Sequence, residues 1–207
     1  MDKKEMRCAS VTELRIKPPE DGKPPIIEGH AAVFDSLSQD LGFVFPFKER
    51  IARGAFKETI GRDDIRALFN HDVNYVLGRN RAGTLELKET PKGLKVRIHP
   101  PDTQWARDLA QSIARGDVTQ MSFGFAAEAE SWSNENGVDV RTLDRVRLFD
   151  VSPVTFPAYL DTDIAVRSAM DSYESHKKTK ENEEHEAEQK RAEFSRLKKL
   201  FGGKNEN

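Results

Sequence analysis

The sequence contains a single cysteine, Cys8, and no apolar run long enough to cross a bilayer. One cysteine cannot form an internal disulfide, and its polar N-terminal surroundings argue against a cysteine nucleophile. The first residues also lack the apolar core of a secretion signal. We therefore expect a soluble, intracellular protein without a membrane-spanning segment.

Net charge is nearly absent as well. Charged residues make up 33% of the chain, yet they leave a net charge of -2. This balance, and the lack of a basic patch with interleaved aromatic residues, disfavours nucleic acid as a partner and a role in DNA packaging. No Gly-x-x-x-x-Gly-Lys phosphate loop occurs, and no His-x-x-x-His or Cys-x-x-Cys pair could seed a zinc site. We expect neither a cofactor nor a metal.

Large apolar residues are scarce at both ends of the chain. Residues 1–10 predict a polar N-terminal extension, and residues 11–170 predict one domain of ordinary size. Residues 171–189 are a nearly continuous mixture of Lys, Glu, Ser and His, which cannot bury enough surface to become ordered. They predict a charged, disordered linker.

Residues 190–207 have a different pattern. The large apolar side chains of this segment recur at helical spacing and share one face: Phe194, Leu197, Leu200 and Phe201. A helix this short is marginal alone in water, so we expect it to form on docking to a partner. The segment predicts a short amphipathic C-terminal tail.

Strand patterns dominate between these ends. Residues 84–88 and 93–99 alternate apolar and polar side chains around a turn, which predicts a hairpin. Residues 121–127 and 143–155 predict two further strands, with a hairpin-type turn at 134–137. The apolar spacing in 103–115 predicts an amphipathic helix, and glycines bound a second helix at 54–61. The pattern indicates an α+β fold, mainly β with a few helices, and not an alternating parallel α/β fold.

Three polar residues lie in apolar, strand-like settings. His71 follows the apolar run 67–69 and could act as a general base, or it could be a turn histidine bonded to a neighbour. Ser122 is flanked by bulky apolar residues and could act as a nucleophile if a base reaches it, or it could be a half-buried strand serine. Outside a Gly-x-Ser-x-Gly elbow, it does not indicate an α/β-hydrolase.

Asp150 interrupts the apolar run 148–151, where an unpaired carboxylate would cost several kcal/mol. Its partner could be a catalytic histidine, or it could be Arg145 or Arg147 in a structural salt bridge. Glu128 and Glu130 are reserve carboxylates on the strand that follows Ser122.

These segments together resemble the prohead protease family of tailed bacteriophages, the capsid-maturation serine proteases. The resemblance covers residues 14–167. Five blocks carry it in order: Gly29-His-Ala-Ala-Val-Phe34, Arg53-Gly-Ala-Phe56, Leu68-Phe-Asn-His71-Asp72, Met121-Ser122-Phe-Gly-Phe125 and Asp150-Val-Ser-Pro-Val-Thr-Phe-Pro-Ala158. Several blocks in the right order are far more specific than any one of them.

The resemblance implies a mainly antiparallel, β-barrel-like core with a few surrounding helices, similar to the herpesvirus assembly protease. It implies that His71 is the base, Ser122 the nucleophile and Asp150 the third member, which orients the imidazole. The oxyanion donors are expected from a turn after Val151 and Ser152.

The resemblance also implies the biological setting. The expected substrates are the scaffolding segment of the major capsid protein and the protease's own chain, cleaved inside the immature capsid in the host cytoplasm. The expected assembly is a homodimer or a shell-associated oligomer. The alternative is a catalytically silent scaffold or shell-assembly protein of the same fold, with the C-terminal tail as its capsid-binding element.

Overall fold

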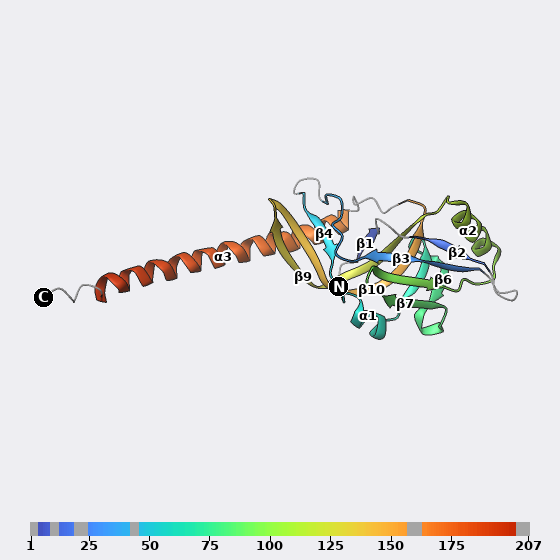
Figure 1. Cartoon of the computed structure of the whole chain (residues 1–207), viewed down its shortest axis with the longest axis horizontal. Helices are drawn as coiled ribbons and strands as arrows, with labels where there is room; N and C mark the ends of the chain where they lie inside the picture. Colours follow the sequence, from blue (N-terminus) through green and yellow to red (C-terminus); the bar gives the residue numbers. More distant parts are fainter. Residues whose placement is uncertain (1–3, 9–12, 19–24, 42–45, 157–162, 202–207) are drawn as a thin grey trace. The chain divides into compact units, whose positions relative to one another are not determined.

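The computed structural model describes residues 4–8, 13–18, 25–41, 46–156 and 163–201. The chain divides into two compact units, residues 1–168 and 169–207. The first unit contains two β-sheets and two α-helices, and most of the second belongs to one long helix (Figure 1). In the described segments, no helix is long and apolar enough to cross a membrane.

The larger sheet has six strands. Their bounds are β1 (Glu5–Cys8), β4 (Lys48–Ile51), β5 (Arg66–Phe69), β6 (Asp72–Arg79), β9 (Gln120–Glu135) and β10 (Val138–Val154). The order is β1-β9-β10-β5-β6, and β4 also pairs with β10. The long β9–β10 hairpin forms the middle of this sheet, with β1 at one edge and β6 at the other.

The smaller sheet has four strands in the order β2-β3-β8-β7. Their bounds are β2 (Arg15–Lys17), β3 (Ile26–Val33), β7 (Leu85–Glu89) and β8 (Gly93–Ile98). The helices of this unit are α1 (Lys57–Arg62) and α2 (Gln104–Arg115), with a 3₁₀ turn, η1 (Asn80–Ala82). The predicted hairpin at 84–99 and the two predicted helices are therefore present, the first helix being shorter than predicted.

The predicted α+β class is confirmed, with one difference. In the part of the chain that the structure describes, the sheets do not close into a barrel, because β1 and β6 are the two ends of the larger sheet's strand order. The pairing is mainly antiparallel, as predicted, and the parallel pairs are those of β10 with β4 and with β5. Parallel pairs join segments far apart in sequence, which local alternation cannot reveal.

One apolar cluster joins the two sheets and α2. It includes Phe123 and Phe125 of β9, Val96 of β8 and Ile113 of α2, all buried. The rings of Phe123 and Phe125 lie 5.0 Å apart, and Phe56 meets Phe123 edge-on at 5.5 Å. Because alternate strand residues face opposite sides, Ser122 and Gly124, the two neighbours of Phe123, lie on the other face of the sheet.

The N-terminus differs from the predicted polar extension. Residues 5–8 form β1, which pairs with β9, so all but Lys4 of the described residues in 1–10 belong to the sheet. The prediction failed because it assumed that polar residues near the N-terminus would be exposed to solvent. Glu5 and Arg7 are buried, and they can be buried because other charges meet them there.

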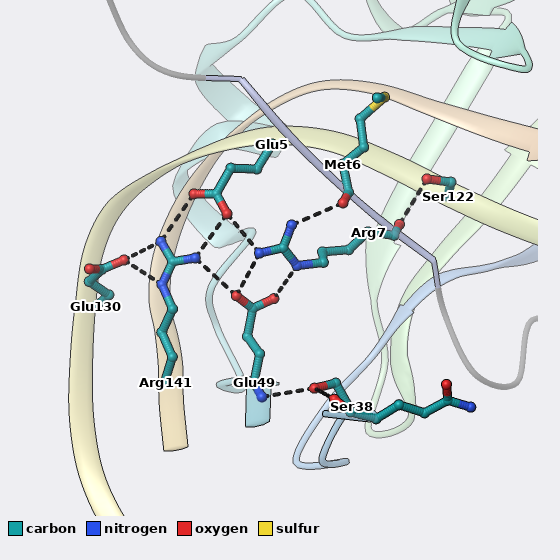
Figure 2. Close-up of polar contacts among 9 residues, drawn as sticks. Glu5, Met6, Arg7, Ser38, Glu49, Ser122, Glu130 and Arg141 are labelled. Atoms are coloured by element: carbon teal, nitrogen blue, oxygen red, sulfur yellow. Dashed lines mark hydrogen bonds and ion pairs between the residues drawn. The ribbon is translucent and has the colours of Figure 1, made fainter. Parts of the chain in front are cut away.

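Those charges form a cluster beneath β1, shown in Figure 2. Arg7 donates to Glu49 at 2.8 Å and to Glu5 at 2.7 Å, and Arg141 donates to Glu5 at 2.9 Å and to Glu49 at 3.0 Å. Arg141 also donates to Glu130 at 2.7 Å. Burial alone would raise the pKa of Glu5, but Arg141 and Arg7 together lower it by more than burial raises it. The pKa of Glu5 therefore lies below its usual value. We call these five residues the buried charge cluster.

Replacing Arg141 with methionine should destabilise the fold by about 3 to 5 kcal/mol, because Glu5 and Glu49 would lose a cation in a buried site. Urea unfolding followed by circular dichroism measures this change. Arg145→Met is the matched control, since Arg145 is 44% exposed and should change stability by less than about 0.5 kcal/mol. Equal effects of the two substitutions would contradict a structural role for the cluster.

Helix α3 (Asp163–Phe201) differs from the predicted linker and short tail. Residues 171–189 lie within one continuous helix, whereas the prediction gave them no order. The segment contains no proline or glycine, and its Glu, Lys, Ala and Gln are strong helix formers that can pair at i,i+4, as Lys190 and Glu186 do. On the predicted apolar face, Phe194 is 71% exposed, and the side chains of Leu197, Leu200 and Phe201 lie outside the described part.

Candidate active site

The structure brings His71, Ser122 and Asp150 into one chain of contacts. The imidazole Nε2 of His71 lies 2.8 Å from the Ser122 hydroxyl oxygen, and its Nδ1 contacts the Asp150 carboxylate Oδ1. Both contacts are within the hydrogen-bond reach that a nucleophile, its base and an orienting group require. An ionised carboxylate cannot donate, so Nδ1 carries the proton and Nε2 is left as an acceptor.

His71 is presented by a two-residue turn between β5 and β6. Phe69 and Asp72 face each other across this hairpin, and Asn70 and His71 both have positive φ, at 52° and 58°. Such a turn usually takes Asn-Gly, because a side chain is disfavoured at positive φ. Asn70 is tied to the end of β10 by a main-chain bond to Pro153, 3.0 Å, and by its side chain to Thr155. A histidine held in this conformation is typical of a functional site.

Ser122 lies on β9, on the face opposite the core. Met121 and Phe123 point into the core, so Ser122 points to the other side of the sheet. Its cross-strand partner on β10 is Ser152, and its partner on β1 is Cys8. The Ser122 side chain is fully buried, at 0% exposure.

A β-bulge in β10 brings Asp150 to the same face as Ser122. Leu148 pairs with Phe125 on the core face, and the next paired residue is Asp150, opposite Gly124. If Phe149 were paired regularly and there were no bulge, simple alternation would put Asp150 on the core face with Leu148. Bulges beside active sites commonly redirect a side chain in this way.

Gly124 makes room for this carboxylate. A Cβ at Gly124 would meet the Asp150 carboxylate and would lie 2.6 Å from Lys4 Cε. The absence of a side chain thus allows Asp150 and Lys4 to cross over β9.

Substituting Gly124 with alanine should therefore displace Asp150 and lower kcat by about 10²-fold, because a misplacement near 1 Å has that order of effect. The measurement is steady-state hydrolysis, with circular dichroism as a check on folding. Gly61→Ala is the control, since a Cβ there meets nothing within 4 Å. Full activity in Gly124→Ala would show that the carboxylate position is not critical.

The electrostatics of Asp150 favour the ionised carboxylate. Burial raises its pKa, but the hydrogen bond and charge of His71 and the ammonium of Lys4 lower it more, so that the pKa of Asp150 lies below its usual value. Lys4 forms an ion pair with Asp150, with its Nζ 2.8 Å from the carboxylate Oδ2. Ser152 supports the same group, because its hydroxyl donates to Oδ1 at 3.2 Å and accepts from the His71 main-chain N–H at 3.3 Å.

The other predicted partners of Asp150 lie elsewhere. Arg145 is 3.4 Å from Glu128, and Arg147 stacks over the ring of Phe149. Within the described part of the chain, the charged partners of Asp150 are His71 and Lys4 rather than either arginine. Glu130 belongs to the buried charge cluster.

His30 and His99 are not part of this site. His30 faces Glu13 and His99 faces Glu86, on the smaller sheet and the segment that follows it. His176 and His185 lie on helix α3. In the described residues, no group of His, Cys, Asp and Glu side chains is arranged to hold a metal ion.

Sequence reasoning missed two residues of the site and misplaced a third feature. Ser152 could have been found, because it lies two positions after Asp150 on the same strand face. Lys4 had no sequence signal, since its contact depends on the pairing of β1 with β9. The predicted oxyanion turn after Val151 and Ser152 is wrong, because β10 continues through both residues to Val154.

Comparison with known proteins gives three results. The sequence profile of the caudovirus prohead serine proteases matches residues 12–179. The chain is 29% identical over 175 residues to the prohead protease of Enterobacteria phage HK97, covering 82% of this chain and 72% of that protein. The bacteriophage T4 capsid assembly protease aligns with a TM-score of 0.46 at 11% identity, covering 75% of this chain and 100% of that one. Since the profile spans most of the chain, this protein belongs to the caudovirus prohead serine protease family.

Proposed function

We propose that the chain is a serine endopeptidase that cleaves the scaffolding segment of the major capsid protein, and its own chain, inside the immature capsid of the host cell. One observation carries the catalytic part: the unbroken line of contacts from Asp150 through His71 to Ser122. Membership of the prohead protease family supports the choice of substrate.

The proposed chemistry proceeds through an acyl-enzyme. His71 Nε2 accepts the proton of Ser122 while the serine oxygen attacks the peptide carbonyl carbon. The protonated imidazole then gives that proton to the leaving amine, and the peptide C–N bond breaks. Water then attacks the ester carbonyl carbon by the same steps, and breaking of the ester C–O bond regenerates Ser122. Asp150 keeps the proton on Nδ1 and stabilises the imidazolium that forms at each step.

Helix α3 suits a role in placing the protease. It exposes Phe194 among charged side chains, and it follows the unit that carries the candidate active site. We propose that this helix binds the inside of the immature shell and is removed by self-cleavage. Intact mass spectrometry of the purified full chain should then show loss of a C-terminal fragment in the wild type and none in Ser122→Ala. A wild type that stays intact during capsid-protein cleavage would contradict self-processing.

Fluorophosphonate labelling tests the catalytic proposal. We expect one covalent adduct, located on Ser122 by tandem mass spectrometry, and no adduct in His71→Ala, because the hydroxyl needs its base to react. Ser131→Ala is the matched control on the same strand and should label like the wild type. A folded protein that never labels would favour the alternative, a silent scaffold protein of the same fold.

A further inference from the structure

Exposed apolar side chains gather around the turn that carries His71. In the described part of the chain, the exposed large apolar residues are Leu37, Val73, Tyr75, Val76, Phe156 and Phe194. Three of these six lie on β6, within five residues of His71. A fourth, Phe156, directly follows Thr155, which is bonded to Asn70 of the same turn. We call the four residues Val73, Tyr75, Val76 and Phe156 the turn patch.

A cluster of this kind differs from ordinary protein surface. Single exposed apolar side chains are common on soluble proteins, but several together mark a surface that binds something. Leu37 is such a single residue, in the segment between β3 and β4. The turn patch instead groups four apolar side chains around the turn that presents the candidate base.

β6 bulges directly after the His71 turn, and the bulge is held in shape. Residues 73–75 lie between two positions of β6 whose partners on β5 are adjacent residues. The ring of Tyr75 meets that of Trp105 on α2 edge-on, with the centroids 5.3 Å apart. Val73, at the start of the bulge, is 76% exposed. The bulge thus presents Val73 to solvent from a segment that α2 supports.

The proposed chemistry requires the leaving part of a substrate to lie beside His71. The imidazole Nε2 faces the Ser122 hydroxyl at 2.8 Å, takes its proton and passes it to the leaving amine. The amine nitrogen must therefore come within about 3 Å of Nε2, so the substrate chain that follows the scissile bond starts next to this ring. Exposure agrees, since the His71 side chain is 11% exposed and that of Asp150 is 3% exposed.

The turn patch lies within reach of that chain. Val73 follows His71 by two positions, so their Cα atoms are at most about 7 Å apart. The bonds between Asn70 and Thr155, 2.9 and 3.2 Å, keep Phe156 near the same turn. An extended peptide advances about 3.3 Å per residue, so the first three residues after the scissile bond can reach the patch.

We propose that the turn patch is the binding site for the leaving side of the substrate, and that it favours a large apolar residue within the first three positions after the scissile bond. The inference rests on the proposed function. Val73 and Phe156 supply the contact surface, and Tyr75 holds the bulge against Trp105. Covering the exposed side chains removes apolar surface from water, which favours substrates that carry a matching apolar residue.

The test compares two substrates with the same acyl part, taken from the mapped cleavage site of the major capsid protein, the proposed substrate. One is a peptide with leucine at the second position after the scissile bond, and the other is a nitrophenyl ester without any residue after it. In the double variant Val73→Ser/Phe156→Ser, we expect kcat/KM for the peptide to fall about tenfold, since the loss of an apolar contact has that order of effect. The ester should react at the wild-type rate, because it has no residue that could lie on the patch.

Leu37→Ser is the matched control, because Leu37 is an exposed apolar residue outside the patch, and it should leave both rates unchanged. The double variant should fold, since Val73 and Phe156 are 76% and 70% exposed, and circular dichroism checks this. A second measurement needs the wild type alone. Moving the leucine through the first three positions, against serine at each, should reveal a preference of about tenfold for leucine at one of them.

Three results would overturn the inference. The first is a wild type without any preference for leucine, and the second is a double variant that loses activity toward the ester as much as toward the peptide. The third is a wild-type dimer that sedimentation velocity shows to dissociate in the double variant, since a second copy would then cover the patch. If neither substrate reacts and a small fluorophosphonate does not label Ser122, the proposed function fails instead.

Discussion

Replacing Ser122 with alanine is expected to lower kcat by about 10⁵- to 10⁶-fold, because the proposed acyl-enzyme route would lose its nucleophile. The fold should persist, since Ser122 makes its two polar contacts through the hydroxyl alone and alanine fits the same strand position. Cleavage of the proposed substrate, the major capsid protein, followed by gel densitometry and mass spectrometry of the fragments, measures the loss.

The control for this substitution is Ser131→Ala, which removes an exposed hydroxyl from the same strand, β9. It should retain the activity of the wild type. If Ser122→Ala kept more than a small fraction of the activity while remaining folded, another group would have to be the nucleophile.

Asp150→Asn is expected to lower kcat by about 10⁴-fold with little change in KM. The amide can donate to Nδ1, which would move the imidazole proton to Nε2 and leave Ser122 without an acceptor. Steady-state kinetics at pH 7 to 8 measure this loss. Asp63→Asn is the control, because Asp63 pairs with Arg62 and not with His71. Similar losses in both variants would point to general destabilisation rather than to the orientation of His71.

The same substitution has a signature in the pH dependence of stability. The pKa of Asp150 lies below its usual value in the fold, so its charge stabilises the native state above the unfolded pKa, and this contribution is lost as pH falls through the native pKa. Asparagine has no such titration. The difference in free energy of unfolding between the wild type and Asp150→Asn should therefore shrink below about pH 4. A difference that stays constant down to pH 2.5 would contradict the lowered pKa.

Local sequence patterns were enough to predict several elements of the fold. The hairpin of β7 and β8 and helix α2 follow from alternation, turn residues and helical spacing, which act over a few residues. The family assignment rested on ordered blocks of sequence. The same blocks contained His71, Ser122 and Asp150, so the choice of candidate site residues needed no structure.

Long-range contacts decided the rest. The burial of Glu5 and Arg7 depends on partners that are distant in the sequence. Arg7 pairs with Glu49, 42 residues away, and Glu5 pairs with Arg141, 136 residues away. No local pattern can signal such partners, and a strand that buries charge therefore looks like an exposed tail in sequence. The same limitation hid Lys4, whose contact with Asp150 exists because β1 docks on β9.

Helix α3 shows a different limit. Its residues 171–189 bury little surface, which predicted disorder, while their helical propensity and i,i+4 charge pairs favour a helix without any core. The sequence by itself determined the family and the three candidate site residues, because these reside in contiguous motifs. Only the tertiary structure decided which strand lies over the nucleophile and which face Asp150 occupies, because strand pairing and the bulge at Phe149 join segments that are distant in the chain.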